Sequence, residues 1–214
     1  GVVRGRAEYV LRKLGGNHPQ AAGVRDIVEQ IDQVTRTIRQ LLDFSRVSPA
    51  TVQPVSIAEA LRDVSELMRF EAERHKIAIE IDAPDNLEPA SADPDQLRQV
   101  LVNLTKNALD ASSPSTRVVL RAGRDGEDAM QSRLRIDIED QGCGIPAASL
   151  NRIFDPFYTT KKRGHGTGLG LAIAAQIVRN HGAEIRVESE EGRGSVVSVL
   201  WPTAVTEERR SHGG

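Results

Sequence analysis

A run of glycines that leads directly into an apolar segment is the feature that most constrains how this chain can fold. Residues 164–173 read GHGTGLGLAI, with glycine at positions 164, 166, 168 and 170. Glycine leaves the backbone free to adopt unusual conformations, whereas the apolar spacing of LGLAIAAQIVRNH predicts a buried helix that begins near Leu169. Backbone amides at a helix start form a ready anion site. The stretch therefore predicts a loop that closes over phosphate groups while its helix stays anchored in the core.

Two better-known glycine motifs do not fit this stretch. A dinucleotide-binding fold has its glycines after the first strand of a strand–helix–strand unit, with an acidic residue about 20 residues further on. Here the glycines come late in the chain, after IFDPFYTTKK. A P-loop needs a lysine followed by serine or threonine, and the stretch lacks that pair. A dehydrogenase of the common type and a P-loop NTPase are therefore both excluded.

The composition favours a globular protein without a strong charge bias. The 214 residues are 39% hydrophobic, with 28 Lys and Arg against 30 Asp and Glu. No apolar run approaches the roughly 20 residues that span a bilayer, so we expect no membrane contact in this segment. The charge balance predicts no nucleic-acid partner. A single cysteine, Cys143, excludes an internal disulfide and a multi-cysteine metal site. We expect a cytoplasmic location, and a membrane anchor in the full-length protein stays open.

The first 48 residues predict a helical hairpin. Apolar residues alternate at spacings of four and three, which indicates a heptad seam; they are Val3, Ala7, Val10 and Leu14, then Ile27, Ile31, Val34, Ile38 and Leu41. The intervening GGNHPQ turns the chain. A first arm of about 14 residues is marginal alone, so we expect the seam to pack against a second copy in a homodimer. A hairpin folded onto its own domain is the alternative.

Residues 49–54 predict a linker, because the segment around them, SPATVQP, is proline-rich and has no periodicity. From residue 55 to residue 203, helix and strand signals alternate. Helical spacing occurs at 60–75, 93–112 and from about 169, and strand patterns occur at 76–83, 117–123, 132–140, 183–190 and 195–202. This order predicts a mixed sheet with helices on one face, a two-layer α/β sandwich. Residues 204–214 predict a disordered tail.

Two asparagines in NLTKN are the first candidate site. Asn103 and Asn107 are four residues apart, so on a helix they share one face. Carboxamides among apolar neighbours are costly unless they are satisfied. They either make capping or core hydrogen bonds, or they supply an oxygen ligand to a hard cation such as Mg²⁺, which leaves other positions to water and phosphates. Asp110, one turn beyond Asn107, is either a further polar contact or a surface residue.

The segment EDQGCGIP follows a predicted strand and is the second candidate. Asp140 stands at the strand end, and Gly142 and Gly144 follow it. Glycines in such a turn let a flat ligand approach the backbone. A carboxylate only accepts hydrogen bonds, so Asp140 suits a donor such as the exocyclic amine of adenine. An ordinary turn explains the same pattern.

The order of these motifs resembles the catalytic ATP-binding domain of sensor histidine kinases, within the wider ATPase superfamily that includes gyrase and mismatch-repair ATPases. The family's N box resembles NLTKNALDA, its first glycine box DQGCGI and its F box IFDPFYTTK. Its second glycine box resembles GTGLGLAI, and EGRGSVVSVLWP resembles its closing strand pair. The first region is similar to the family's dimerisation and phosphotransfer hairpin, whose second helix ends in a phrase such as LLDFSR. The resemblance extends over nearly all of residues 1–203.

This resemblance implies the histidine kinase/gyrase-type ATPase fold, with ATP and Mg²⁺ as cofactors. Asn107 would ligate Mg²⁺ that bridges the ATP phosphates, with Asn103 and Lys106 beside it. Asp140 would accept from the adenine amine. The residues implied in ATP binding are Asn103, Lys106, Asn107, Asp110, Asp140, Gly142, Gly144, Ile145, Phe154, Gly166, Thr167, Gly168, Leu169 and Gly170.

The family's acceptor histidine lies in a motif of the form H-E-x-x-x-P-L, which this sequence lacks. His18 falls in the predicted turn, and GVVRGRAEYVLRKL resembles the helix after the acceptor. The resemblance implies a protein histidine kinase of a two-component system, with a response-regulator receiver domain as partner. We expect this chain to bind Mg-ATP without phosphorylating itself. A non-catalytic nucleotide-sensing scaffold and a serine kinase of the same superfamily are the alternatives.

Overall fold

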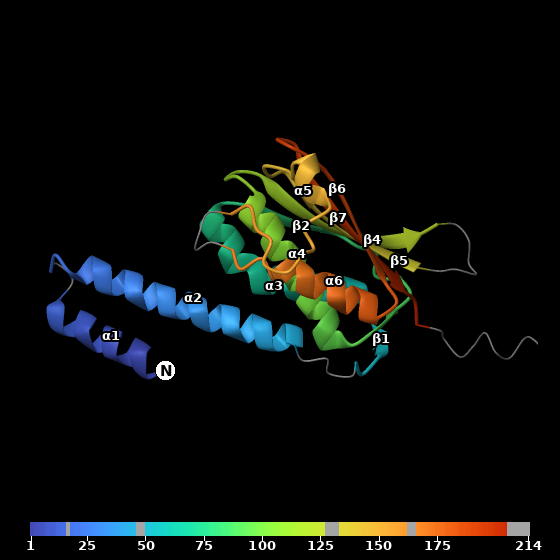
Figure 1. Ribbon diagram of the computed structural model, residues 1–214. Coiled ribbons are helices and arrows are strands. Elements are labelled where there is room, and N and C mark those ends of the chain that lie inside the picture. Colours follow the sequence, from blue (N-terminus) through green and yellow to red (C-terminus); the bar gives the residue numbers. More distant parts are fainter. Residues whose placement is uncertain (16–17, 46–49, 127–132, 162–165, 205–214) are drawn as a thin grey trace, which may run out of the picture. The chain divides into compact units, whose positions relative to one another are not determined.

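The computed structural model describes residues 1–15, 18–45, 50–126, 133–161 and 166–204 (Figure 1). The chain divides into two compact units. One comprises Gly1–Ser48 and Phe157–Leu169, and the other comprises Pro49–Pro156 and Gly170–Gly214. The predicted tail at 205–214 lies outside the described residues. No helix in the described part of the chain is long and apolar enough to cross a bilayer.

The first unit contains the predicted helical hairpin. Its arms are α1, Val2–Leu14, and α2, Ala21–Ser45. Gly15 follows α1 with a φ of 75°, a conformation that glycine adopts without strain. An ion pair of 2.9 Å between Arg4 and Asp32 joins the two arms. The hairpin is thus confirmed, with a first arm as short as the sequence predicts.

Much of the heptad seam is not covered within the hairpin. Val3 is 65% exposed, and Ile27, Val34 and Ile38 are each between 52% and 56% exposed. Ile31 is half-buried. The side chain of Leu41 lies outside the described part of α2. An apolar row that is left exposed on a helix pair has the character of a contact surface.

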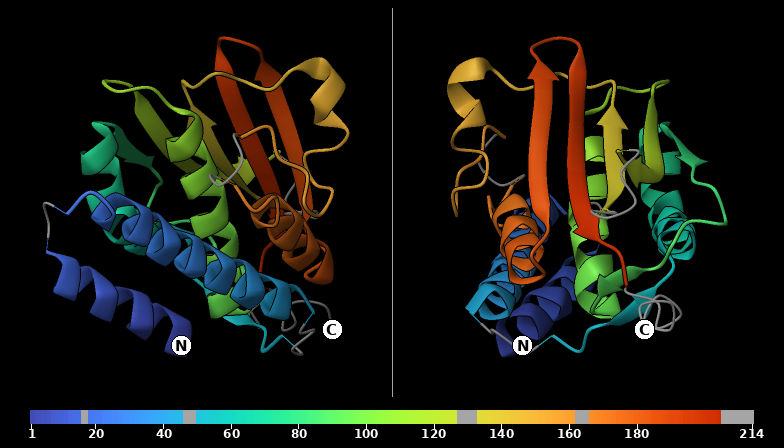
Figure 2. Two further views of the ribbon diagram at one scale, coloured as in Figure 1. Left: turned by 60° about the vertical axis from the view of Figure 1, so that its left-hand side comes forward. Right: turned by 90° about the vertical axis from the view of Figure 1, so that its right-hand side faces the viewer.

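The second unit is built on a five-stranded mixed sheet, as predicted. Its strands, in spatial order, are β2 (Ala78–Asp82), β4 (Arg117–Asp125), β5 (Arg133–Asp140), β7 (Gly194–Pro202) and β6 (Glu184–Glu190). The β2–β4 pair is parallel and the other pairs are antiparallel. Helices α3 (Ile57–His75), α4 (Pro94–Ala111) and α6 (Gly170–Asn180) cover one face, as Figure 2 shows. The two-layer α/β sandwich is therefore confirmed.

Three short elements were not predicted. Strand β1, Gln53–Val55, pairs antiparallel with β3, Ala90–Ala92, so the end of the predicted linker belongs to a small second sheet. Helix α5, Ala147–Leu150, follows the glycine turn. Segments of three or four residues are too short to show a periodicity, because a strand or helix pattern needs several repeats.

The helices begin and end where their side chains satisfy the free backbone groups. Asp93 caps α4 by accepting from the amides of Asp95 and Gln96, and Pro94 occupies the first helical position. Ser56 caps α3 in the same way.

The helix-facing row of β5 is apolar until its last residue, Asp140, because Leu134, Ile136 and Ile138 alternate with outward polar residues.

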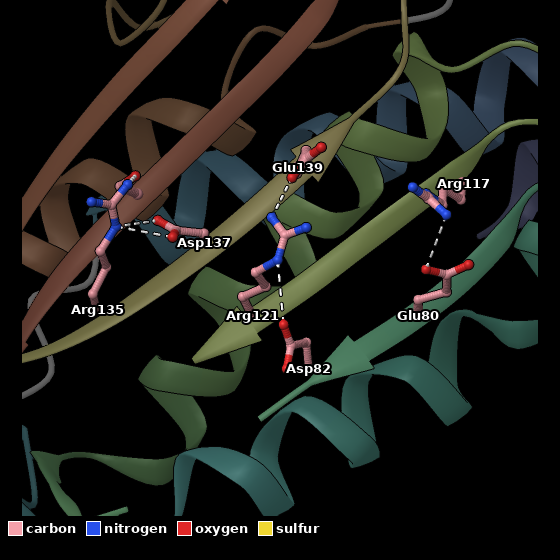
Figure 3. Close-up of polar contacts among 8 residues, drawn as sticks. Glu80, Asp82, Arg117, Arg121, Arg135, Asp137 and Glu139 are labelled. Atoms are coloured by element: carbon pink, nitrogen blue, oxygen red, sulfur yellow. Dashed lines mark hydrogen bonds and ion pairs between the residues drawn. The ribbon is translucent and has the colours of Figure 1, made fainter. Parts of the chain in front are cut away.

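The other face of the sheet carries cross-strand ion pairs, which Figure 3 shows. Arginines on β4 and β5 pair with acidic residues on the same or adjacent strands: Arg117 with Glu80, Arg121 with Asp82 and Glu139, and Arg135 with Asp137. Such exposed pairs contribute little stability individually. Ser198 of β7, which is buried, lies opposite Asp137 on this face and accepts from Arg135 at 3.3 Å.

Candidate functional site

The two asparagines of α4 lie beside the start of α6. Both side chains are half-buried. A Cβ atom added at Gly170, the first residue of α6, would lie 3.8 Å from Asn107 Nδ2 and 3.9 Å from Asn103 Oδ1. Asn103 Nδ2 is buried and has no hydrogen-bond partner among the residues that the structure describes. A core hydrogen bond therefore does not account for this amide group, and it lies beside a helix N-terminus, where anions are stabilised.

Asp140 ends the inward row of β5 and is only 6% exposed. Its Oδ1 accepts a 2.8 Å hydrogen bond from the Gly142 amide. Burial raises the pKa of Asp140, while the amide of Gly142 and the amide and hydroxyl of Ser195 oppose that rise by donating to the carboxylate. A buried carboxylate with bound donors on one side is a fixed acceptor for a further donor.

Ser195 is a site residue that the sequence analysis missed. It lies opposite Asp140 in the β5–β7 pairing, and its hydroxyl is 2.9 Å from that of Ser189. Ser189 in turn accepts from the Ile145 amide at 2.8 Å. The pairing register brings Ser195 to Asp140 across more than 50 positions of the chain, so no local pattern could have identified it.

The glycine turn after Asp140 is crowded on both sides. A Cβ atom at Gly142 would lie 2.4 Å from the carbonyl oxygen of Ala111, the last residue of α4. Gly144 has a φ of 66°, and a Cβ atom there would lie 2.1 Å from the carbonyl oxygen of Glu190. Close backbone approach therefore requires both glycines, beyond what an ordinary turn needs.

The backbone of Cys143 holds this turn in place through two hydrogen bonds. Its amide donates to the Ala111 carbonyl at 3.1 Å, and its carbonyl accepts from the Gly192 amide at 2.8 Å. The turn is thus held between the end of α4 and the β6–β7 turn. The Cys143 side chain is exposed, and its chemistry plays no part in these contacts.

Three other predicted residues of this unit are exposed or half-buried. Lys106 and Asp110 are exposed on α4, and Phe154 is half-buried in the segment after α5.

No group of three or more His, Cys, Asp or Glu residues that could hold a metal ion occurs in the described part of the chain. A cation at this site would therefore depend on carboxamide oxygens and on the ligand's own oxygens, as Mg²⁺ sites commonly do.

The remaining predicted residues, Gly166 to Leu169, belong to the first unit. The amide of Phe157 donates to the carbonyl of Gly168 at 2.9 Å. A Cβ atom at Gly168, whose φ is 66°, would lie 2.4 Å from the carbonyl carbon of Phe157. Thr167 Oγ1 accepts weakly from the Leu169 amide at 3.5 Å. The backbone of Gly168 thus lies against that of Phe157, and Gly164 lies outside the described residues.

Helix α4 aligns the parts of the site. Asn103, Asn107 and Ala111 are spaced by four and share one face, so the carboxamides and the glycine turn lie along a single line. Four residues of helix rise about 6 Å. This geometry can accept a donor group at the Asp140 end and hold charged oxygens at the Gly170 end.

Comparisons with known proteins agree with this geometry. Residues 92–205 match the family described as histidine kinase-, DNA gyrase B-, and HSP90-like ATPase. The sensor histidine kinase ZraS of Escherichia coli is 33% identical over 206 residues, which cover 95% of this chain and 42% of ZraS. The chain thus spans less than half the length of that curated relative.

Two solved structures share the fold. Full-length ShkA in complex with AMPPNP has a TM-score of 0.75 and 28% identity, and the match covers 95% of this chain and 43% of ShkA. Histidine kinase ThkA in complex with the response regulator protein TrrA has a TM-score of 0.72 and 22% identity, over 94% of this chain and 57% of that one. The expected ATPase-type fold is confirmed.

Proposed function

The chain belongs to the histidine kinase-, DNA gyrase B- and HSP90-like ATPase family, and from that premise we propose that it binds Mg-ATP and transfers the γ-phosphoryl group to a protein histidine. The family match and the sensor-kinase relatives identify residues 92–205 as a histidine kinase-type ATPase domain. Binding by this chain and the identity of the acceptor are the proposed part.

The observation that carries the proposal is the pairing of Asn103 and Asn107 with the start of α6. The carboxamides of Asn103 and Asn107 lie within 3.9 Å of a Cβ atom built at Gly170, at the N-terminus of α6, and the Asn103 Nδ2 is unpartnered among the described residues. This combination suits phosphate oxygens together with a hard cation. Asp140, further along the same side of α4, suits the amine of adenine.

We assign Asn107 as the residue that would hold Mg²⁺, which when bound neutralises charge on the phosphates. Asn103 and the amides at the start of α6 would orient the phosphate chain. Gly166 to Leu169 would supply backbone amides to it. Asp140, with Gly142, Gly144 and Ile145, would form the adenine wall. The catalytic contribution of these residues is positioning and charge stabilisation, which dominate phosphoryl transfer.

In the proposed reaction, an unprotonated imidazole nitrogen of the acceptor attacks the γ-phosphorus. The bond to the bridging oxygen breaks, ADP leaves, and the ring releases its remaining proton. We propose that the acceptor is supplied outside residues 1–214, because no histidine in this sequence lies in an H-E-x-x-x-P-L motif. His18 is exposed in the turn, and its Nδ1 accepts from the Gln20 amide at 3.2 Å.

We further propose the organisation that the sequence predicts: a helical hairpin over residues 1–48, a linker at 49–54 and an ATP-binding domain at 55–203. The exposed seam of the hairpin supports a homodimer. A response-regulator receiver domain is the proposed recipient of the phosphoryl group, and the ThkA complex with TrrA gives a precedent within the same fold.

The first test is nucleotide affinity by isothermal titration calorimetry with Mg-AMPPNP. We expect binding by the 214-residue chain and a loss of at least about tenfold on Asn107→Ala, since a hydrogen bond or ligand to a charged group contributes about 1.5–3 kcal/mol. Asn86→Ala, in an exposed loop outside the site, should bind like the wild type. No binding by the wild type would refute the proposal.

The second test separates kinase from sensor. The chain is incubated with γ-labelled Mg-ATP and a hairpin protein that carries an H-E-x-x-x-P-L motif but no working ATP site. Acid-labile label on the hairpin protein alone supports a histidine kinase. Binding without transfer favours the nucleotide-sensing scaffold, and label on His18 would contradict the proposed absence of an internal acceptor.

A further inference from the structure

Two ring side chains hold the turn that leads into α4. Trp201 Nε1 donates to the carbonyl of Ser91 at 2.9 Å, and the amide of Asp93 donates to His181 Nε2 at 3.1 Å. The two rings lie 5.0 Å apart with a tilt of 45°. Trp201 comes from the last strand of the sheet, and His181 directly follows α6. The start of α4 is therefore tied to both elements.

The hydrogen bonds determine the protonation state of His181 in this arrangement. Because the Asp93 amide is a donor, Nε2 must be unprotonated. Nδ1 lies 2.9 Å from the carbonyl oxygen of Ile177, so Nδ1 carries the proton and donates it to that oxygen. The imidazole is thus neutral and uses both nitrogens. A doubly protonated ring could not accept, and the partly buried Asp93 amide would lose its acceptor.

The carboxylate of Asp93 holds a third element at the same point. One oxygen caps α4, and the other accepts from the Thr51 amide at 2.8 Å, just before β1. Desolvation opposes ionisation of Asp93, but the amides of Gln96, Thr51 and Asp95 outweigh it, so its pKa is lowered. Two charged groups belong to the elements next to His181. Asp93 faces it from the start of α4, and Arg179 of α6 donates a hydrogen bond to Gln176.

These contacts lie at the opposite end of the α4–α6 pair from the asparagines. Asp93 precedes α4 and His181 follows α6, whereas Asn103 and Asn107 lie beside the first residue of α6. The two helices that frame the site therefore lie close together at the asparagines and are linked by a hydrogen bond at His181. A helix moves as a rigid body, so a shift at Asp93 displaces the carboxamides.

We propose that neutral His181 is a positioning residue for nucleotide binding. It joins the end of α6 to the start of α4 and thereby aligns Asn103 and Asn107 with Gly170. Loss of this acceptor loosens the alignment. The inference rests on the proposed function for the identity of the ligand, but not for the contact between the helices.

Two substitutions distinguish positioning from packing. His181→Phe keeps a ring against Trp201 and removes both hydrogen bonds. His181→Gln places an amide oxygen near the position of Nε2, and this oxygen accepts at every pH. His75→Gln, at the end of α3, is the control for an unrelated histidine.

The first measurement needs no nucleotide. Hydrogen exchange at the Asp93 amide, which donates to His181, should be about tenfold faster, or more, in His181→Phe than in the wild type at pH 8. His181→Gln should behave like the wild type at pH 8. Equal exchange in the Phe variant and the wild type at pH 8 would overturn the proposed contact.

The second measurement is Mg-AMPPNP affinity at pH 8. We expect His181→Phe to bind about fivefold more weakly or more than the wild type, and His181→Gln and His75→Gln to bind like the wild type. A Phe variant that loses only thermal stability, with the wild-type affinity, would reduce His181 to a packing residue. If the wild type binds no nucleotide, the proposed function fails while the exchange data still decide whether His181 holds α4.

Discussion

The buried carboxylate of Asp140 has a predictable effect on stability and binding. Burial raises its pKa. As the pH rises, the native state therefore keeps the carboxyl proton to a higher pH than the unfolded chain does. The resulting stability is full below the unfolded pKa of about 3.9 and is lost as the pH rises through the higher folded pKa. Asp140→Asn removes this loss, because the carboxamide is neutral and its oxygen can still accept from Gly142.

We therefore expect Asp140→Asn to be more stable than the wild type at neutral pH, with the difference vanishing at low pH. Urea unfolding at a series of pH values measures this. The same variant should bind Mg-AMPPNP about 10- to 100-fold more weakly, since the adenine amine then meets a neutral carboxamide in place of a carboxylate. A variant that unfolds with the wild-type pH dependence would contradict the assigned pKa direction, and unchanged affinity would contradict the adenine role.

Two glycines with the same backbone conformation provide a matched pair. Gly144 has a φ of 66° and Gly182 a φ of 65°, but a Cβ atom would meet the Glu190 backbone only at Gly144 and open space at Gly182. Gly182→Ala should cost about 1–2 kcal/mol, from the left-handed conformation alone.

Gly144→Ala carries that strain and also forces the turn away from Glu190. We expect at least twice the loss in unfolding free energy, with weaker nucleotide binding, whereas Gly182→Ala binds normally. Thermal melts and calorimetry on both variants measure these effects. Equal losses in the two variants would mean that the close approach to Glu190 is unimportant.

At the scale of elements, the cap at the start of α4 determines how acid affects the sheet unit. The pKa of Asp93 is lowered by its backbone donors despite desolvation. Its contribution to stability is therefore present above the unfolded pKa and is lost as the pH falls through the folded pKa. Removal of an N-cap of this type costs about 1 kcal/mol.

Asp93→Ala should thus lower the unfolding free energy at pH 7 by about 1–2 kcal/mol and lose less stability than the wild type on acidification. Asp63→Ala, an exposed aspartate of α3, is the matched control and should change neither quantity. Urea titrations at pH 7 and pH 4 give both numbers. Parallel acid losses in the wild type and Asp93→Ala would contradict the role of the cap.

For the whole molecule, the exposed heptad seam predicts the association state. Ile38 is 52% exposed on α2, and an aspartate there would bury a charge if a second copy covered the seam. We expect Ile38→Asp to weaken the dimer by at least about tenfold in sedimentation velocity.

Phe70 makes a suitable control for this experiment. It is 76% exposed on α3, outside the hairpin, so Phe70→Asp should leave the association state unchanged. A monomeric wild type, or an equal effect of both substitutions, would argue against the hairpin as the dimer surface.

The sequence by itself determined the elements that depend on local spacing. The seam of Ile27, Val34 and Ile38, the shared face of Asn103 and Asn107, and the apolar row of β5 are all readable because side chains repeat with the period of the helix or strand. The order of the helix and strand patterns then predicted the sandwich, and the order of the motifs predicted the family. The roles given to the predicted site residues stay predictions until nucleotide binding is measured.

Only the tertiary structure decided which distant residues meet. Ser195 lies against Asp140 because β7 pairs with β5, Gly144 must be glycine because the Glu190 backbone approaches it, and His181 reaches Asp93 because α6 packs along α4. Each contact joins segments 44 or more positions apart. Local periodicity specifies what an element is and which face is apolar, whereas pairing register and helix packing depend on the whole core, so these partners become visible only once the chain is folded.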